Sequence, residues 1–366
     1  MRQVFAGVMS GTSLDGVDAV IADFAPTTGK PCALLAEVHV PFTRGLADEL
    51  RSLQRAGSDE LARAARAANA LADTYADAIV ATLGRAGLAA ADVVAAGVHG
   101  QTLRHRPDEG WTLQLNNPAR VAERAGMAVV ADFRSRDVAA GGEGAPLVPA
   151  FHAAVFGGDA HRVVVNLGGI ANLTDLPAHG EVRGFDTGTG NVLLDLWHAR
   201  HRGAAYDRDG AWARSGRVSA ALLATLLAEP FFARMPPKST GRDLFHGEWL
   251  DAKLAGRTIA PADVQATLVA LTARTVGDAV EKHCAAATEI LVCGGGARNH
   301  ALMDALTAVL APRAVATTAV HGVAVEHVEA LAFAWLAREA LAGRPGNLPA
   351  VTGARGLRVL GAIYPR

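Results

Sequence analysis

The sequence predicts an α/β fold built from two similar halves. Segments with the patterns of strands and helices alternate along its 366 residues, and each half opens with a strand, a glycine-rich turn and a second strand. Hydrophobic residues make up 50% of the chain and charged residues 19%, which is enough apolar material for two cores.

The first half begins with a predicted β-hairpin. Val4–Met9 and Val17–Phe24 are short apolar runs separated by turn-forming residues. A long helix follows, with apolar residues at helical spacing over 61–83 and Ser58 as its expected N-cap. A buried strand is expected at Val93–Val98.

The second half repeats this order. Strands are expected at Arg162–Asn166 and Ile170–Leu176, around the turn Gly168–Gly169, and later at Glu289–Cys293. Helical patterns cover Val218–Ala228, Pro261–Cys284, Ala301–Leu310 and Glu326–Leu341.

The composition of the chain limits which kinds of binding partner and cellular location are expected. The 35 Lys and Arg residues nearly balance the 36 Asp and Glu residues and form no basic cluster, so no nucleic-acid partner is expected. The 3 cysteines are too scattered for a disulfide framework or a zinc site and are expected to be free thiols. No run approaches the roughly 18 apolar residues of a membrane span, and the N-terminus lacks a signal-peptide pattern. We therefore expect a cytoplasmic protein with no membrane partner.

Three glycine-rich corners each follow a short apolar strand, at Ser10–Gly16, Asn166–Ile170 and Gly294–Asn299. Glycine lacks the Cβ that would keep a phosphate away from the backbone, and consecutive N–H groups form an anion-binding nest. An ordinary hairpin loop explains any one corner equally well, but three at strand ends favour phosphate binding. The P-loop, protein-kinase and G-x-S-x-G patterns are absent, and Asn299 stands where G-x-G-x-x-G requires glycine.

Asp186 lies among three glycines in the segment Gly184–Asn191, which we expect to be a loop. Its carboxylate could act as a general base. The local sequence slightly favours an Asx-turn, in which Asp186 bonds its own backbone. The stretches 131–146 and 236–243 are also rich in turn formers and polar groups. Taken alone, a domain-crossing loop and a surface turn explain them better than a functional role does.

Together these motifs resemble the anhydro-N-acetylmuramic acid kinase family of the actin-like ATPase and sugar-kinase superfamily. The resemblance is carried by Met9–Asp18, His99–Thr102, Asp132–Pro146, Asn166–Asn172, Gly184–Asn191, Pro236–Arg242, Cys293–Asn299, Glu329–Trp335 and Asn347–Gly353.

The resemblance implies two actin-like, ribonuclease H-like domains that flank a nucleotide cleft. One domain would comprise residues 1–130 with about 345–366, and the other residues 131–344. ATP and Mg²⁺ are the implied cofactors, with unknown metal ligands, and the family suggests a homodimer. The implied nucleotide contacts are Gly11, Thr12, Ser13, Leu14, Asp15, Gly16, Val17 and Asp18, then Asn166, Gly168 and Gly169, and then Gly294, Gly295, Gly296 and Asn299.

The resemblance also implies a reaction on a small sugar, 1,6-anhydro-N-acetylmuramic acid. Asp186 would deprotonate a water that attacks C1, and the bridging oxygen would leave C1 and attack the γ-phosphate of ATP. The products would be N-acetylmuramic acid 6-phosphate and ADP, as in peptidoglycan recycling. Gln101, Thr102, Arg134 and Glu329 are the expected sugar contacts, although a structural hydrogen bond explains each of them equally well.

The sequence departs from the usual family pattern at three places. Thr189 stands where Pro is common, and we expect it to loosen the Asp186 segment because Pro restricts φ. Glu143 stands where Gln is common and adds a negative charge. Val325–His327 replaces a stretch that often begins Pro-Asp.

Two alternatives remain open from the sequence. One is a kinase for another amino sugar, in which Asp186 would deprotonate a free hydroxyl directly. The other is a nucleotide-dependent binding or regulatory protein on the same fold, because fold alone does not fix function.

Overall fold

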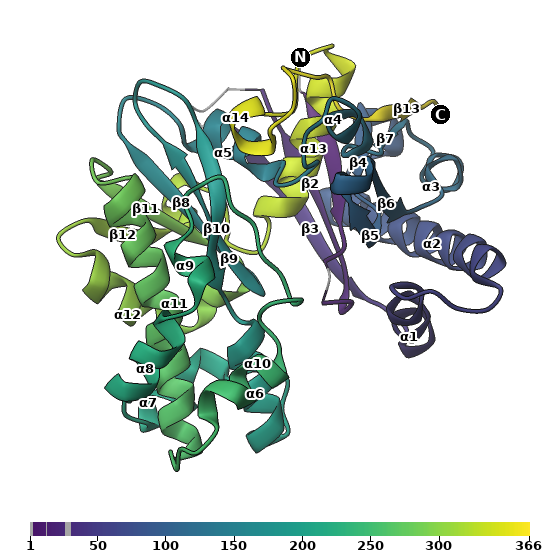
Figure 1. Cartoon of the computed structure of the whole chain (residues 1–366). Helices are drawn as coiled ribbons and strands as arrows, with labels where there is room; N and C mark the ends of the chain where they lie inside the picture. Colours follow the sequence, from purple (N-terminus) through teal and green to yellow (C-terminus); the bar gives the residue numbers. More distant parts are fainter. Residues whose placement is uncertain (1–2, 12, 26–30) are drawn as a thin grey trace. The chain divides into compact units, whose positions relative to one another are not determined.

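The computed structural model describes residues 3–11, 13–25 and 31–366. The chain divides into unit 1, Met1–Val155 with His327–Arg366, and unit 2, Phe156–Glu326. Each unit combines a β-sheet with helices (Figure 1), so the α/β prediction is confirmed.

The sheet of unit 1 has six strands. In spatial order they are β13 (Ala362–Tyr364), β7 (Val129–Ala131), β4 (Ala95–Val98), β1 (Val4–Met9), β2 (Gly16–Asp23) and β3 (Ala33–Pro41). β1, β2 and β3 form an antiparallel meander, while β4 lies parallel to β1 and β7 parallel to β4. The predicted N-terminal hairpin is therefore confirmed, and β13 closes the sheet antiparallel to β7.

The sheet of unit 2 repeats this topology with five strands. In spatial order they are β10 (Arg183–Thr189), β9 (Ile170–Leu176), β8 (Arg162–Leu167), β11 (Glu289–Cys293) and β12 (Ala314–Thr317). β8, β9 and β10 form the antiparallel meander, and β11 lies parallel to both β8 and β12. The similarity predicted for the two halves thus extends to strand order and direction.

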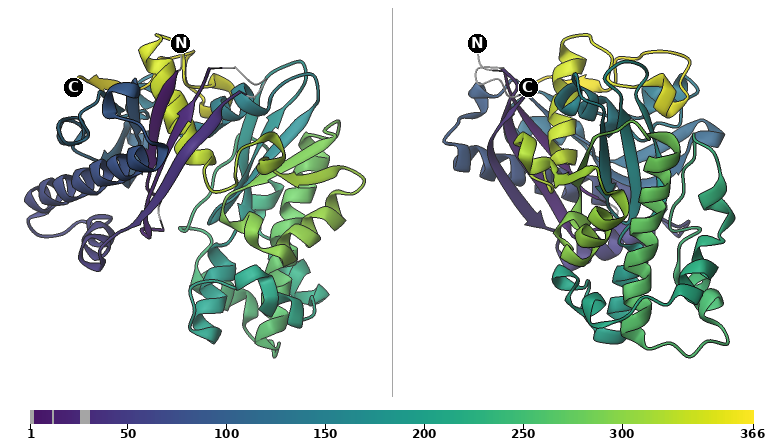
Figure 2. Two further views of the ribbon diagram at one scale, coloured as in Figure 1. Left: turned by 180° about the vertical axis from the view of Figure 1, so that it is seen from behind. Right: turned by 90° about the vertical axis from the view of Figure 1, so that its left-hand side faces the viewer.

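Helices cover both faces of the unit 1 sheet (Figures 1 and 2). α2 (Glu60–Ala86) and α3 (Pro118–Ala125) bury the face that carries Val4, Ala6 and Val8. The side chains of a strand alternate between faces, so Gly7 faces the opposite side, where α13 (Val328–Leu341) packs. A Cβ on Gly7 would lie 1.9 Å from the Ala330 carbonyl oxygen, so this approach of helix to strand requires glycine.

The remaining elements of unit 1 are shorter. They are α1 (Arg44–Leu53), η1 (Ala90–Asp92), the hairpin strands β5 (Gln101–Arg106) and β6 (Trp111–Leu115) joined by η2 (Pro107–Glu109), α4 (Ser135–Ala139), α5 (Val148–Phe156), which ends at the unit boundary, and α14 (Pro349–Thr352).

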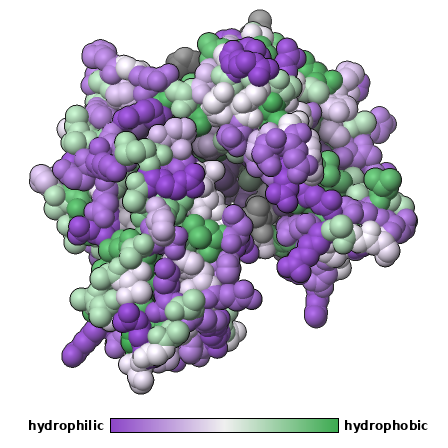
Figure 3. Space-filling view, viewed as in Figure 1, coloured by the Kyte–Doolittle hydropathy of each residue, from purple (hydrophilic) through white to green (hydrophobic). Residues whose placement is uncertain are grey.

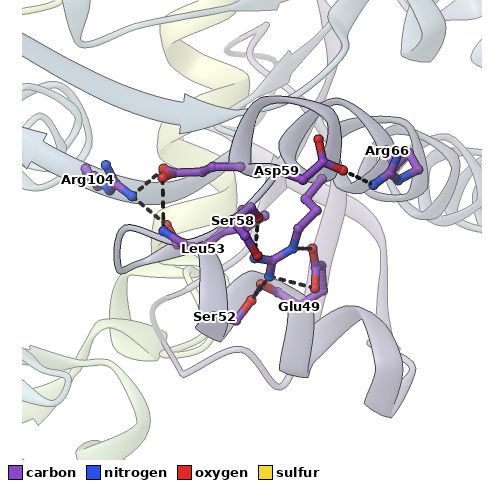
Figure 4. Close-up of polar contacts among 10 residues, drawn as sticks. Glu49, Ser52, Leu53, Ser58, Asp59, Arg66 and Arg104 are labelled. Atoms are coloured by element: carbon purple, nitrogen blue, oxygen red, sulfur yellow. Dashed lines mark hydrogen bonds and ion pairs between the residues drawn. The ribbon is translucent and has the colours of Figure 1, made fainter.

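The start of α2 differs from the expectation that Ser58 caps it. The N-cap is Asp59, with φ of 49° and no capping bond from its side chain. Ion pairs fix this end of the helix instead: Arg63 binds Glu49 of α1 at 2.8 and 3.0 Å, and Arg104 of β5 pairs with Glu60 (Figure 4). Contacts between elements therefore replace the local cap.

In unit 2, α11 (Pro261–His283) runs along one face of the sheet (Figure 2) and shares a core with α6 (Val192–Arg202) and α12 (His300–Leu310). The helices predicted over α11 and α12 are confirmed to within a residue at each end. The other helices are η3 (Arg208–Gly210), α7 (Ala211–Ser215), α8 (Ala220–Leu227), α9 (Pro230–Ala233), α10 (Gly247–Leu254), η4 (Gly295–Arg298) and η5 (Thr318–His321).

The unit boundaries, 155/156 and 326/327, differ from the 130/131 and 344/345 expected from the sequence. The buried carboxylate of Asp137 accepts hydrogen bonds from the Gly144 amide (2.8 Å), Asn347 Nδ2 (2.7 Å) and Thr352 Oγ1 (2.8 Å). These bonds tie the segment after β7 to the C-terminal segment. Residues 131–155 therefore belong to unit 1, as does α13, which packs on β1.

No helix in the described part of the chain is long and apolar enough to cross a membrane. Cys32, Cys284 and Cys293 are buried thiols, as their spacing predicts. On the face shown in Figure 3, hydrophilic residues are spread among hydrophobic ones.

Candidate active site

Asp186 lies in strand β10, which corrects the prediction of a loop. It pairs with Asn172 of β9, and a bulge interrupts the ladder between Asp186 and Gly188. Gly188 has φ of 148°, and a Cβ there would lie 2.6 Å from the Phe232 ring. Gly188, one of the glycines that suggested a loop, therefore lies at a bulge, a feature that re-aims side chains at functional sites.

The Asp186 carboxylate is held by a segment more than 50 residues away in sequence. Its Oδ2 accepts a hydrogen bond from the Thr240 amide at 2.9 Å, and its own amide donates to the Lys238 carbonyl at 3.1 Å. No Asx-turn of Asp186 forms, since the carboxylate bonds Thr240. The stretch 236–243 therefore does more than form a surface turn.

Burial raises the pKa of Asp186 to about 6, against the opposing effects of the Thr240 N–H and the charge of Lys238. A carboxylate that titrates close to neutral pH can accept a proton at physiological pH and is a better base than an ordinary aspartate.

The two glycine corners of unit 2 lie beside the start of α6. The amides of Gly190 and Asn191 donate to the carbonyls of Gly169 (2.9 Å) and Gly168 (2.8 Å). A Cβ on Gly294 would lie 2.4 Å from Asn166 Oδ1. The structure thus brings Asn166, Gly168, Gly169 and Gly294 together in a backbone cradle, which we refer to as the glycine cradle.

Three further residues of the Gly294–Asn299 corner differ in their surroundings. Gly296 also approaches the β8 corner, because its Cβ would lie 2.6 Å from the Leu167 Cβ, whereas a Cβ on Gly295 would meet nothing within 4 Å. Asn299 is the N-cap of α12: its Oδ1 accepts a hydrogen bond from the Leu302 amide at 3.1 Å. The glycine cradle therefore consists of backbone, while the Asn299 side chain supports the following helix.

The first glycine corner, in unit 1, contains strained backbone. Leu14 is buried and has φ of 59°, in the left-handed region that non-glycine residues seldom occupy. Ser13 Oγ donates to Asp15 Oδ1 at 2.7 Å. Thr12 lies outside the described residues.

The predicted contacts Val17 and Asp18 lie in β2, as expected from the sequence, and Gly16, which was expected in the turn, is the first residue of β2. The side chain of Val17 is buried in the core of unit 1, so only its backbone can face a ligand. Asp18 pairs with His39 of β3 at 2.8 Å.

The four predicted sugar contacts all lie in unit 1, and three of them have partners near the first glycine corner. Gln101 is fully buried, and its Nε2 donates to the Gly11 carbonyl at 3.1 Å. Arg134 donates to His99 Nε2 at 3.0 Å and to the Gly144 carbonyl at 2.8 Å. Burial lowers the pKa of Arg134 to about 10, against the opposing charge of Glu329.

Glu329 and Thr102 complete this set. Burial raises the pKa of Glu329, the Arg134 guanidinium opposes this shift, and the carboxylate of Asp18 adds to it. Thr102 Oγ1 accepts a hydrogen bond from Gln114 Nε2 at 3.3 Å and so is part of the β5–β6 hairpin. Arg134, Glu329 and Asp18 thus interact electrostatically.

Sequence reasoning named Gln101 at these places but did not name His99 or Asn116 as site residues. His99 Nδ1, Gln101 Oε1 and both amide atoms of Asn116 are buried, and none has a hydrogen-bond partner among the described residues. A Cβ on Gly100 would lie 3.3 Å from the Asn116 Cβ, which places Asn116 beside the His99–Thr102 motif. The His99–Thr102 motif marks His99 and Gln101 in the sequence. No motif marks Asn116, because folding alone brings the end of β6 beside the His99–Thr102 segment.

The departures from the family pattern have local roles. Thr189 does not loosen a loop: it pairs with Ile170 in the β9–β10 ladder, and its Oγ1 lies 3.4 Å from Thr272 Oγ1 of α11. Glu143 is exposed, and its amide donates to the Thr352 carbonyl at 2.7 Å. The Val325 carbonyl accepts a hydrogen bond from the Gly294 amide at 3.0 Å.

Within the described ranges, no group of three or more His, Cys, Asp or Glu side chains is placed to hold a metal ion. The carboxylates of Asp15 and Asp18 offer the oxygen ligands that Mg²⁺ prefers, and Mg²⁺ in kinases is commonly held by few carboxylates together with substrate phosphates. The carboxylates of Asp15 and Asp18 are therefore suitable ligands for a Mg²⁺ ion that would bind together with a nucleotide.

Comparison with known proteins agrees with the sequence resemblance. Residues 3–366 match the family described as anhydro-N-acetylmuramic acid kinase. The anhydro-N-acetylmuramic acid kinase of Cupriavidus pinatubonensis is 57% identical over 371 residues, covering 99% of this chain and 98% of its own length. The protein of the same name from Paraburkholderia xenovorans is 56% identical over 370 residues, with coverage of 99% and 98%.

Solved structures with similar folds are much more distant in sequence. Component A of (R)-2-hydroxyglutaryl-CoA dehydratase from Acidaminococcus fermentans is 13% identical, with a TM-score of 0.49 and coverage of 91% of this chain and 96% of that one. A ROK family glucokinase from Streptomyces griseus is 15% identical, with a TM-score of 0.40 and coverage of 93% and 100%. On the match to nearly its whole length and its identity to curated relatives, the chain belongs to the anhydro-N-acetylmuramic acid kinase family.

Proposed function

We propose that the protein is an ATP-dependent kinase that hydrolytically opens 1,6-anhydro-N-acetylmuramic acid and phosphorylates O6. The observation that carries this proposal is the partly buried Asp186 carboxylate, held by the Thr240 amide with a pKa near 6, in the same unit as the glycine cradle. Membership of a family of this name supports the choice of substrate.

In the proposed reaction, ionised Asp186 takes a proton from a water whose oxygen attacks C1. The bond between C1 and the bridging oxygen breaks, and that oxygen attacks the γ-phosphorus as the bond to ADP breaks. The products are N-acetylmuramic acid 6-phosphate and ADP, which serves peptidoglycan recycling. Phosphoryl transfer requires mainly positioning and charge stabilisation from a protein.

The glycine cradle fits a polyphosphate. Backbone N–H groups at glycine corners bind anions where a Cβ would obstruct them, and side chains at Gly294 and Gly296 would collide with the β8 corner. We propose that Asn166, Gly168, Gly169 and residues 294–296 contact ATP in unit 2. The corner Gly11–Asp18 is proposed to contact phosphate in unit 1, with Mg²⁺ held chiefly by the nucleotide.

The sugar contacts are proposed in unit 1. The planar guanidinium of Arg134 suits the lactyl carboxylate of the substrate, and the buried amide of Gln101 offers a donor and an acceptor. Thr102 and Glu329 complete the proposed set. A cytoplasmic homodimer is the proposed state, which light scattering after size-exclusion chromatography tests for the oligomer.

Product analysis in ¹⁸O-labelled water tests the reaction. The protein is incubated with ATP, Mg²⁺ and the anhydro sugar, and the products are examined by mass spectrometry. The proposal expects the label at C1 of the phosphorylated sugar and none in the phosphate. Label in the phosphate contradicts the proposal, because it means that water attacks phosphorus and ATP is merely hydrolysed. Turnover of N-acetylglucosamine but not of the anhydro sugar also contradicts it and favours a kinase for a free hydroxyl.

The Asp186→Asn variant tests the base. Sugar phosphorylation should fall by about 10³-fold or more, because general-base catalysis typically contributes 10²–10⁴-fold, while ATP affinity measured by calorimetry should stay within about twofold. Near-normal turnover would remove Asp186 from the mechanism. ATP binding with no phosphorylation of any sugar by the unmodified protein would support a binding or regulatory protein instead.

A further inference from the structure

A segment of unit 2 that follows α9 lies against the candidate base. We call Pro236–Thr240 the strap. It is bound to Asp186 at two points: the Asp186 amide donates to the Lys238 carbonyl at 3.1 Å, and the Thr240 amide donates to the Asp186 carboxylate at 2.9 Å. The strap therefore sets both the backbone and the carboxylate of Asp186.

The side chain of Lys238 anchors the strap from the opposite direction. Only 8% of Lys238 is exposed, which is unusual for lysine. Its Nζ donates to the carbonyls of Phe231 (3.4 Å) and Phe232 (3.2 Å) in α9 and lies 4.8 Å from the centre of the Phe231 ring. The Lys238 ammonium thus binds the short helix α9, while the backbone of Lys238 binds β10.

Burying an ammonium costs free energy unless it has compensating partners. Burial and the like charges of Lys282 in α11 and Arg234 after α9 lower the pKa of Lys238, and Asp186 is the carboxylate that opposes them. Burial, followed by the like charges of Lys282 and Lys238, lowers the pKa of the neighbouring His283. Among these groups, Asp186 is the one whose charge favours keeping Lys238 protonated.

We infer that Lys238 is a positioning residue for the proposed base: its ammonium, bound to the Phe231 and Phe232 carbonyls, locks the strap so that the Thr240 amide faces the Asp186 carboxylate. The positive charge of Lys238 also favours the ionised form of that carboxylate. This inference rests on the proposed function. Lys238 acts through Asp186 and needs no contact with either substrate.

The test replaces Lys238 by methionine, which keeps the length and the apolar stem and removes the charge and the donors. The matched control is Lys253→Met in the same unit, where Nζ lies 5.3 Å from the Trp249 ring centre and 3.5 Å from Glu229. Both variants and the unmodified protein are assayed for kcat and KM over pH 5–9. Lys238→Gln retains a donor for the two carbonyls and replaces the methionine variant if that variant does not fold.

In Lys238→Met, kcat at neutral pH should fall by about tenfold or more, with KM within about twofold. The acidic limb of the kcat profile should move up by about one pH unit, because a nearby opposite charge commonly shifts a carboxyl pKa by 1–3 units. Lys253→Met should keep the profile of the unmodified protein. A merely structural role of Lys238 would lower activity without moving the limb, and that result overturns the inference.

Carbon-13 NMR separates failure of this inference from failure of the proposed function. The Asp186 carboxyl signal, assigned by its loss in Asp186→Asn, is titrated in aspartate-labelled protein without substrate. Its midpoint should rise in Lys238→Met whether or not the substrate has been correctly identified. An unchanged midpoint refutes the role of Lys238, whereas inactivity of the unmodified protein with a shifted midpoint refutes only the proposed reaction.

Discussion

Single side chains acquire their chemistry here from neighbours distant in sequence. Asp186 is half-buried, accepts a hydrogen bond from Thr240 and lies near Lys238. Its sequence neighbours are Phe185 and Thr187, flanked by glycines, and they do not indicate which group will hold the carboxylate. The residue type and the glycine-rich context could be read from the sequence, whereas the strap that holds the carboxylate could not.

The pH dependence of the reaction follows from this environment. Because the pKa of Asp186 is raised to about 6 and the ionised form is the base, kcat should be constant above about pH 7 and fall as pH decreases through 6. Measurement of kcat with saturating substrates over pH 4.5–8 checks this. A fall in kcat centred near pH 4, the ordinary range of an aspartate, would contradict the assignment of the buried Asp186 as the base.

Asp137 is the second side chain whose role depends on distant partners. Its carboxylate is fully buried and accepts hydrogen bonds from Gly144, Asn347 and Thr352. Asp137→Ala should lower the free energy of unfolding by about 3 kcal/mol, because three donors lose their charged acceptor. Urea denaturation measures this, and the exposed Asp108→Ala should change stability by less than about 0.5 kcal/mol. Equal effects in both variants would contradict a joining role for Asp137.

Secondary-structure elements were predicted well where an apolar run or a helical repeat was bounded by clear turn signals. The hairpin of β1 and β2, strands β8, β9 and β11, and helices α11 and α12 lie within a residue or two of their expected ends. β10 was missed because three glycines disfavour a strand in isolation, and its pairing with β9 overrides that preference. α2 ends at Gly87, whose φ of 66° suits a glycine C-cap, whereas its start departs from the cap predicted at Ser58.

The packing of α13 on β1 gives a prediction for an element contact. Gly7→Ala should destabilise the protein by about 3 kcal/mol or more, because its Cβ would lie 1.9 Å from the Ala330 carbonyl oxygen and 2.8 Å from the Ala334 amide nitrogen. Gly84→Ala in α2 is the matched control, since its Cβ would meet nothing within 4 Å, and it should stabilise by about 0.5–1 kcal/mol. Thermal or urea unfolding distinguishes the two, and a neutral Gly7→Ala would refute the close packing.

At the largest scale, each unit repeats one sheet topology, and unit 1 is completed by the C-terminal part of the chain. α13, α14 and β13 all belong to unit 1, although about 170 residues of unit 2 precede them. The position of Asn347 and Thr352 beside Asp137 shows how the two segments of unit 1 are joined.

Removal of residues 345–366 should therefore act on unit 1. The truncated chain loses the β7–β13 pairing and two of the donors to Asp137. Hydrogen exchange measured by mass spectrometry should show faster exchange in peptides covering β7 and α4, with peptides covering β8, β9 and β11 changed much less. Equal acceleration in both sets would contradict the assignment of this segment to unit 1.

Local patterns in the chain were sufficient for the α/β class, the repeated halves and the glycine corners, because periodicity and turn chemistry act over a few residues. The role predicted for Asp186 came from the family resemblance, since its local sequence slightly favoured an Asx-turn. Folding decided the unit boundaries, the bulged strand that carries Asp186 and the meeting of strap and carboxylate. These features depend on contacts between residues about 50 to 215 positions apart, and no local preference encodes which distant donor will face a buried carboxylate.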